Sequence, residues 1–461
     1  MIILIVMIFV AIKRRQNTTG MIHAIPMELC CKYLIFFANN KLKISIFAHT
    51  DMKYNTHTLV NGLRIIHLPD VSPVIYCGYG IAAGTRHELD SQEGMAHFCE
   101  HATFKGTQRR GPLNIINCLE RVGGDLNAFT NKESTVFYAA LLKEHLPKAV
   151  DLLTDIVFHS TYPQQEIEKE VEVICDEIES YNDSPAELIF DDFENLLFAH
   201  HPLGHNILGQ ADRLRTYSSE QLRQFTASHY RANNAIFFAY GDISFDRLVK
   251  MLEKATADLP AGLPLVNRKE YPALPTQTGN RRVEIQKNTH QTHVMMGNRA
   301  YPVGHPHRIA LYLLNNLLGG PGMSTRLNLA LRERNGLVYA VDSSMLSYAD
   351  TGTWCTYFGC DAHDTARCIR LVRRELDRLM QQPLNSSALN NAKKQLKGQI
   401  AVACDNRESF ALDFAKGFLH YGWQKDVTDL YAEIDALNAP LLQQVAQEIF
   451  DSNAMTTLIY T

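Results

Sequence analysis

The sequence predicts an α+β protein with two homologous domains, each an antiparallel sheet backed by helices. Strand-like and helix-like segments follow one another without the strict strand–helix alternation of a parallel sheet. The chain also repeats itself at a constant offset of 220 residues. Residues 221–240 and 441–460 each read as an amphipathic helix, an Asn turn and an apolar strand, and Asn233 meets Asn453. A proline-rich stretch separates the two halves, as expected for a linker.

These observations divide the 461 residues into four segments. Residues 1–51 are expected to form an N-terminal extension outside the fold, and residues 52–258 the first domain. Residues 259–278 are expected to be the linker, and residues 279–461 the second, homologous domain. The chain is too long for one small domain, which agrees with this division.

Two stretches of the first domain carry clear secondary-structure signals. Thr58–Leu68 and Val74–Ala82 read as paired strands, followed by a helix that begins near Glu93. Further along, Gln164–Glu179 has apolar residues at helical spacing, which predicts a long amphipathic helix. Each predicted helix carries residues that could do chemistry.

Composition excludes several classes of function. A net charge of −4 gives no basic surface for nucleic acid and no polybasic patch for a membrane. Hydrophobic content of 46% with 20% charged residues is ordinary for a globular protein. The ten cysteines are scattered without a CxxC pair, which favours free thiols in a reducing compartment. We therefore expect a cytoplasmic location.

The N-terminal segment leaves one alternative open. Met1–Ile12 is apolar and is followed by Lys13, Arg14 and Arg15. Twelve helical residues rise about 18 Å, short of the roughly 30 Å hydrocarbon core of a bilayer. A signal peptide would carry its positive charge before the apolar run. No firm membrane association is expected, and the alternative is association through this apolar segment.

The most informative pattern is His97-Phe98-Cys99-Glu100-His101. On a helix, His101 lies roughly 40° from His97 and Glu100 roughly 60° the other way, so all three project from one side. Two histidines at i and i+4 can bind one metal ion, and the glutamate then stands beside a coordinated water. The order His-x-x-Glu-His reverses the zincin order and is called the inverzincin motif. The alternative for these five residues is a polar patch on an amphipathic helix.

A catalytic zinc site needs a third protein ligand, and the acidic helix offers candidates. Glu170 and Glu177 are seven residues apart, so they lie within roughly 20° of one another at the edge of its apolar stripe. The other acidic residues of the segment point away from that stripe. The alternative is an ordinary solvated acidic helix.

These motifs resemble the pitrilysin/insulinase family of zinc peptidases, which includes mitochondrial processing peptidase and insulin-degrading enzyme. The matching features are Gly94–His101 followed by Phe104–Thr107, and the two glutamates seven residues apart. The resemblance implies one Zn²⁺ per chain with His97, His101 and Glu177 as ligands. It further implies Glu100 as general base and Glu170 as a residue that supports a ligand.

Other landmarks extend the resemblance from about Asn55 to the C-terminus. Asp125–Thr130 is similar to the family's edge strand, which implies that Asn127, Ala128 and Phe129 bind an extended substrate. Arg332 and Tyr339, also seven residues apart, are similar to an Arg/Tyr pair in the family's second half and are implied to act in catalysis. The implied fold is that of mitochondrial processing peptidase, in a short, two-domain, bacterial-type member.

The resulting prediction is a zinc-dependent endopeptidase that cleaves extended or unfolded peptides in an enclosed chamber. Its expected partners are a peptide substrate and, in a homodimer or heterodimer, a second homologous chain; nucleic acid is not expected. The rival prediction is a non-catalytic structural or assembly subunit of a homologous peptidase complex. The intact metal motif and Arg/Tyr pair favour the enzyme.

Overall fold

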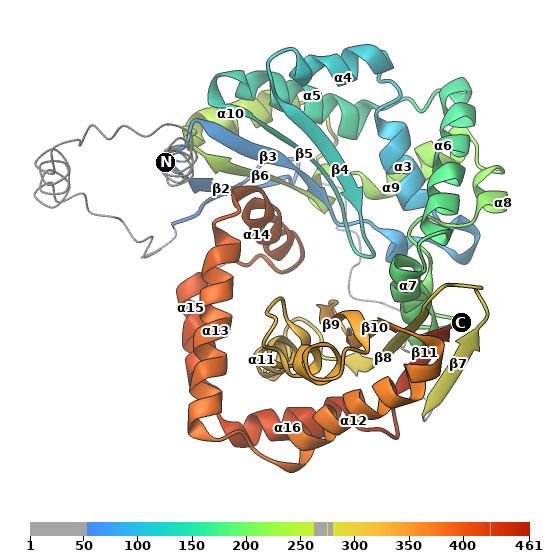
Figure 1. Ribbon diagram of the computed structural model, residues 1–461. Helices are drawn as coiled ribbons and strands as arrows, with labels where there is room; N and C mark the ends of the chain where they lie inside the picture. The colour runs from blue at the N-terminus through green and yellow to red at the C-terminus, as the bar shows by residue number, and fades with distance from the viewer. Residues whose placement is uncertain (1–52, 262–273, 275–279, 425) are drawn as a thin grey trace, which may run out of the picture. The chain divides into compact units, whose positions relative to one another are not determined.

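The structure is a computed structural model that describes residues 53–261, 274, 280–424 and 426–461 (Figure 1). The predicted N-terminal extension and most of the predicted linker lie outside the described residues. Within the described part of the chain, no helix combines the length and the apolar character needed to cross a bilayer.

The described strands form two sheets. The first has the order β1-β2-β6-β3-β5-β4 and the second the order β7-β11-β8-β10-β9. The strands of the first sheet are β1 (Asn55–Thr58), β2 (Arg64–Pro69), β3 (Val74–Ile81), β4 (Asp125–Thr130), β5 (Thr135–Leu142) and β6 (Ala235–Gly241). The strands of the second sheet are β7 (Arg281–Ile285), β8 (Thr292–Ala300), β9 (Val338–Ser347), β10 (Gly352–Cys360) and β11 (Thr456–Tyr460).

The helices surround these sheets (Figure 1). Those of the first half are α3 (Met95–Thr103), α4 (Pro112–Glu120), α5 (Leu146–His159), α6 (Gln164–Asn182), α7 (Pro185–Leu197), α8 (Ala211–Leu214), α9 (Ser219–His229) and α10 (Phe245–Ala255). Those of the second half are α11 (Arg308–Gly319), α12 (Thr365–Gln381), α13 (Ser386–Cys404), α14 (Arg407–Tyr421), α15 (Val427–Ala436) and α16 (Ala439–Ile449), with a π-helix, η6 (Asn328–Glu333).

The internal repeat predicted from the sequence is confirmed by the sheets. Helix α9 leads into β6, and helix α16 leads into β11, at corresponding places in the two halves. Strand β6 then runs parallel to β2, and β11 runs parallel to β7. With β1 set aside, the two sheets have the same strand order. The α+β class is confirmed, although each sheet contains one parallel pair and is therefore mixed.

One predicted pairing is wrong. Thr58–Leu68 is not one strand, because a turn at residues 59–63 separates β1 from β2, which pair with each other. Nor does β2 pair with β3, since β6 lies between them and bonds to both. Adjacent strands in sequence usually pair, but here the place beside β2 is filled by β6, which begins more than 150 residues after β2, once β3, β4 and β5 have formed the rest of the sheet.

The first sheet is buried on both faces, which explains why β6 reads as a continuous apolar run. Phe237 packs with the helices of the first half, in a cluster that contains residues of α3, α5 and α9. Its neighbour Phe238 faces the other way and packs with Phe414 of α14, a helix of the second half.

The second sheet is covered in the reciprocal way. One face packs on helices of its own half, where Val294 and Trp354 belong to one buried cluster with residues of α11, α12 and α16. On the other face, Met295 and Leu458 pack against Phe193 of α7, a helix of the first half. Helix α14 of the second half thus covers one face of the first sheet, and helix α7 of the first half covers one face of the second sheet.

Candidate active site

The two histidines lie on α3, as the sequence predicts. This helix begins after Gly94, whose φ of +84° is a left-handed conformation that favours glycine. A side-chain carbon at Gly94 would come within 2.7 Å of Gly209, itself a positive-φ glycine. The start of α3 is therefore held against the 205–209 loop at a distance that only glycine permits.

A buried carboxylate binds the first turn of α3. Glu88 accepts hydrogen bonds from the backbone N–H groups of Gly94, at 3.1 Å, and Ala96, at 2.7 Å. These are among the N–H groups that have no partner inside a helix, so the side chain of Glu88 supplies the acceptors that the helix lacks. Burial raises the pKa of Glu88 to about 8, against the opposing effect of these hydrogen bonds. Glu88 therefore orients the helix that carries both histidines.

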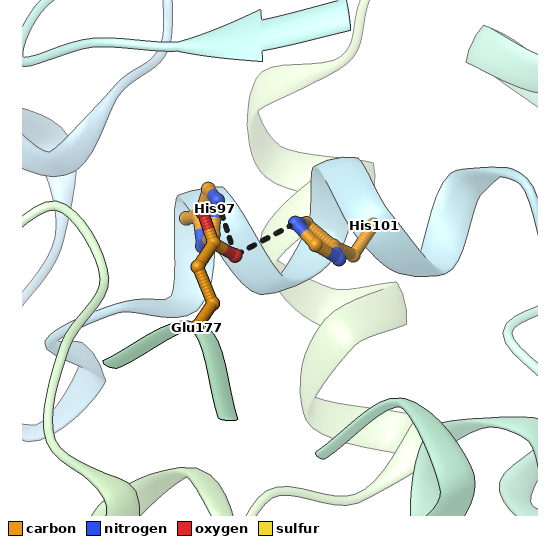
Figure 2. A group of neighbouring side chains, drawn as sticks. All are labelled: His97, His101 and Glu177. Atoms are coloured by element: carbon orange, nitrogen blue, oxygen red, sulfur yellow. Dashed lines mark ion pairs between the residues drawn. The ribbon is translucent and has the colours of Figure 1, made fainter. Parts of the chain in front are cut away.

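Helix α6 brings Glu177 to the histidines (Figure 2). An oxygen of its carboxylate, Oε2, lies 3.5 Å from Nε2 of His101 and 3.9 Å from Nε2 of His97. The two imidazole rings are 4.5 Å apart at their centroids. One donor atom from each residue thus lies within 4.8 Å of the others. The histidine side chains are largely buried, whereas that of Glu177 is 45% exposed, so the group opens to solvent on the glutamate's side.

The second glutamate of α6 supports His101. Glu170 is buried and accepts a hydrogen bond from Nδ1 of His101 at 2.9 Å, while Nζ of Lys105 lies 2.5 Å from its other oxygen. Burial alone would raise the pKa of Glu170, but the contacts with His101 and Lys105 outweigh it and lower the pKa. The carboxylate is thereby kept ionised, and it turns Nε2 of His101 toward Glu177.

Replacing Glu170 with Gln is expected to weaken zinc binding by about 10- to 100-fold, because partners of metal-binding histidines orient the ring and raise its basicity. Competition with a chromophoric chelator measures this affinity. Glu172→Gln is the matched control, since Glu172 lies on the same helix with an exposed side chain paired with Arg215. Equal zinc affinity of the two variants would contradict the role of Glu170.

The two histidines differ in their tendency to bind a proton. Burial, and then the nearby His101, lower the pKa of His97 to about 3, so its imidazole is neutral at physiological pH. Burial would also lower the pKa of His101, but Glu170, Glu100 and Glu177 together outweigh it and raise the pKa. Acidic conditions therefore protonate His101 before His97.

The predicted base, Glu100, lies on the same helix and is buried. The hydroxyl of Thr130, the last residue of β4, donates a hydrogen bond to its Oε2 at 2.7 Å. Burial raises the pKa of Glu100, while Thr130 and His101 act in the opposite direction. A carboxylate with a raised pKa takes up a proton more readily than an ordinary glutamate, as a general base must.

The predicted substrate strand is an edge strand. Among the described strands, β4 bonds to β5 alone, with Asn127 opposite Tyr138 and Phe129 opposite Val136. Its other side presents unpaired backbone groups, to which an extended chain can add as a further strand. Thr130 ends this strand at Glu100, so a peptide along β4 would pass beside the base.

The side chains of Arg332 and Tyr339 lie next to each other in the second half. Arg332 belongs to η6 and Tyr339 to β9, and the guanidinium lies 6.0 Å from the ring centroid. Arg332 also lies 3.6 Å from Glu333. Tyr339 is 83% exposed. In the described part of the chain, neither side chain makes an ion pair or hydrogen bond with the histidines or Glu177.

Two supporting residues could not be identified from the sequence. Glu88 precedes His97 by nine residues, outside any helical spacing that would link them. Thr130 belongs to the segment that resembles the edge strand, but its contact with Glu100 spans 30 residues. The one sequence feature that pointed to Thr130 was its position at the end of a strand that contains polar residues.

The donor set of His97, His101 and Glu177 fits zinc. Tetrahedral ligands about 2.0–2.1 Å from zinc lie roughly 3.4 Å from one another, close to the 3.5 and 3.9 Å between Oε2 of Glu177 and the two histidine nitrogens. Nδ1 of His97 is buried and makes no hydrogen bond with any described residue.

A second group, Asp361, His363 and Asp364, also clusters, but it is largely exposed, as acidic surface groups commonly are.

Comparison with known proteins shows the family. The family model for insulinase (peptidase family M16) matches residues 67–211, and the model for the peptidase M16 inactive domain matches residues 216–396. An uncharacterized zinc protease of Bacillus subtilis is 33% identical over 87% of this chain and 97% of its own length. Bovine mitochondrial-processing peptidase subunit beta is 31% identical over 91% of this chain and 87% of its own length.

Solved structures share the fold. A protease from Helicobacter pylori superposes with a TM-score of 0.84 at 23% identity, covering 89% of this chain and 99% of the other. A peptidase M16 inactive domain from Pseudomonas fluorescens superposes with a TM-score of 0.80 at 20% identity, covering 88% of this chain and 98% of the other. The solved structures show the fold, and the family models with the relatives at 31–33% identity place the chain in the insulinase family of peptidases, peptidase family M16.

Proposed function

We propose that the protein is a zinc-dependent endopeptidase acting on extended or unfolded peptides. His97, His101 and Glu177 would hold one Zn²⁺, and Glu100 would act as general base. The observation that carries the proposal is the convergence of the three donor atoms beside a buried glutamate and an open strand edge. Relatives named zinc proteases support it.

The residues of this chain can be given separate tasks. Zinc, when bound, would lower the pKa of a coordinated water from about 15.7 toward 7. Glu100 would accept the proton as the water attacks the peptide carbonyl, and would then return it to the leaving amine. The Thr130 hydroxyl would hold Oε2 of Glu100 in place. Asn127, Ala128 and Phe129 would align the substrate backbone along β4.

A digest of mixed peptides tests this function. The full chain loaded with zinc is incubated with a defined mixture of unstructured peptides, and new termini are identified by mass spectrometry. We expect internal cleavage that a metal chelator abolishes and added zinc restores. A zinc-loaded protein that binds peptides without cleaving any of them would favour the rival function, a non-catalytic subunit of a peptidase complex.

We further propose that the enclosed chamber is shared between two homologous chains, in a homodimer or a heterodimer. The exposed Tyr339 and its neighbour Arg332 would face the zinc site of the other chain and bind the substrate carbonyl region. Enclosure between two chains would hold the peptide in register and shield the reaction from water. The similarity to a subunit of mitochondrial-processing peptidase supports a homologous partner.

For a homodimer, mixing the inactive variants Glu100→Gln and Arg332→Ala is expected to restore activity. Half of the dimers are then mixed, and each has one of its two sites intact, so roughly a quarter of the wild-type activity returns. Different affinity tags on the two variants report subunit exchange. If mixed dimers form and activity stays at background, the shared-site model is wrong.

A further inference from the structure

The turn between β9 and β10 makes three consecutive contacts with the first half. The hydroxyl of Tyr348 donates a hydrogen bond to Oε1 of Glu194 at 2.7 Å, and the backbone N–H of Ala349 donates to Glu133 at 3.2 Å. The carboxylate of Asp350 pairs with Arg86 at 2.5 Å. Arg86 and Glu133 are buried and also pair with each other at 2.8 Å. A single turn of the second half thus binds three charged side chains of the first.

Each of these side chains belongs to a segment that leads to the candidate active site. Arg86 lies two residues before Glu88, which binds the start of α3. Glu133 lies in the β4–β5 turn, three residues after Thr130, which binds Glu100. Glu194 lies on α7, which directly follows and contacts α6, the helix of Glu177.

The same segments are also joined to one another inside the first half. The backbone N–H of Arg86 donates to the carbonyl of Lys132 at 2.8 Å. The ammonium of Lys132 is buried, donates to the carbonyl of His205 and lies 4.0 Å from Glu194. The loop before α3, the β4–β5 turn and α7 therefore meet in one buried charged network.

We propose that the β9–β10 turn, through Tyr348 and Asp350, is a positioning element for the metal site and its base. Two carboxylates fix the direction of the buried Arg86 guanidinium, because the guanidinium fork is directional, and loss of the Asp350 contact loosens this arrangement. The turn would thus fix the loop that orients α3 and the hairpin that carries Thr130. This inference rests on the proposed zinc site and assigns the second half a role within its own chain.

The two halves share a second Arg–Asp contact, which provides a matched control. Arg407 of α14 pairs with Asp70 at 2.7 Å and donates to the carbonyl of Val74 at 3.2 Å. Val74 begins β3 and Ile81 ends it on the side that leads to Arg86, so the two contacts are separated by about 23 Å of strand. Asp350 and Asp70 have comparable side-chain exposures, 31% and 18%.

The test compares Asp350→Asn, Tyr348→Phe and Asp70→Asn in the full chain. Two quantities are measured: the zinc dissociation constant by chelator competition, and amide hydrogen exchange of the zinc-free protein. We expect Asp350→Asn and Tyr348→Phe to raise the dissociation constant by about 3- to 30-fold and to speed exchange in residues 95–103 and 127–135. Asp70→Asn is expected to change the dissociation constant by less than about twofold, whatever its effect on thermal stability.

If the Asp350 and Tyr348 variants match Asp70→Asn in both measurements, the proposal is overturned. Should Asp350→Asn not fold, Tyr348→Phe decides alone, since it removes one hydroxyl. Should the wild type bind no zinc, the proposed function fails, and the exchange comparison alone decides whether the turn positions α3 and the β4–β5 hairpin.

Discussion

Glu100→Gln is expected to lower kcat for a peptide substrate by about 10²- to 10⁴-fold, the range contributed by a positioned acid–base group. Zinc content should stay at the wild-type level, because Glu100 is not among the three converging donor groups. The amide has nearly the shape of the carboxylate and can still accept the hydrogen bond from Thr130, so the fold is retained. A fluorogenic peptide assay gives kcat, and inductively coupled plasma mass spectrometry gives the number of zinc ions per chain.

The pattern of the two measurements separates the roles. A base variant loses turnover and keeps zinc, whereas a ligand variant loses both. Thr130→Val is a milder companion, because it removes the hydroxyl that holds Oε2 of Glu100 but leaves the carboxylate. Wild-type kcat in Glu100→Gln would remove Glu100 from the mechanism.

Replacing a predicted ligand should have the largest effect on the metal. Structural zinc sites bind with about 10–16 kcal/mol. Divided among four ligands, this is about 3 kcal/mol each, or roughly 10²- to 10³-fold in affinity. His97→Ala and Glu177→Gln are each expected to lose zinc to this extent, together with activity and the rise in melting temperature that zinc confers.

The control for these variants is His159→Ala, which removes a histidine of the same half. His159 lies on α5 and pairs with Asp258 at 2.8 Å, not with the cluster. It should keep wild-type zinc affinity. If Glu177→Gln binds zinc as tightly as His159→Ala, Glu177 is not a ligand and the third position belongs to another group. Circular dichroism of each variant establishes that the fold is intact.

Local patterns predicted those parts of the molecule whose partners are close in sequence. His97, Glu100 and His101 share one side of a nine-residue helix because their spacing is set by helical periodicity. The stripe of apolar residues likewise predicted α6, with Glu170 buried at its edge. The repeat at residues 221–240 and 441–460 predicted two similar halves, because a repeated sequence forms the same supersecondary unit.

Long-range pairing was beyond the reach of such patterns. The short connection between β2 and β3 made their pairing a reasonable expectation. In the structure, β6 lies between them and pairs with both. The contacts of Glu88 with α3, and of Asp350 with Arg86, join residues with no periodic relation. Buried charged groups need partners, but the sequence does not show which of the many charged residues will pair with each other.

X-ray absorption at the zinc edge of the full-length protein shows whether His97, His101 and Glu177 bind zinc. We expect one zinc per chain in a shell of nitrogen and oxygen at about 2.0–2.1 Å, with the outer scattering of two imidazoles. No sulfur should be present, although the described cysteines are free thiols and two of them, Cys99 and Cys175, lie on α3 and α6 themselves. A zinc–sulfur shell at about 2.3 Å, or a spectrum unchanged by His97→Ala, would contradict the assignment.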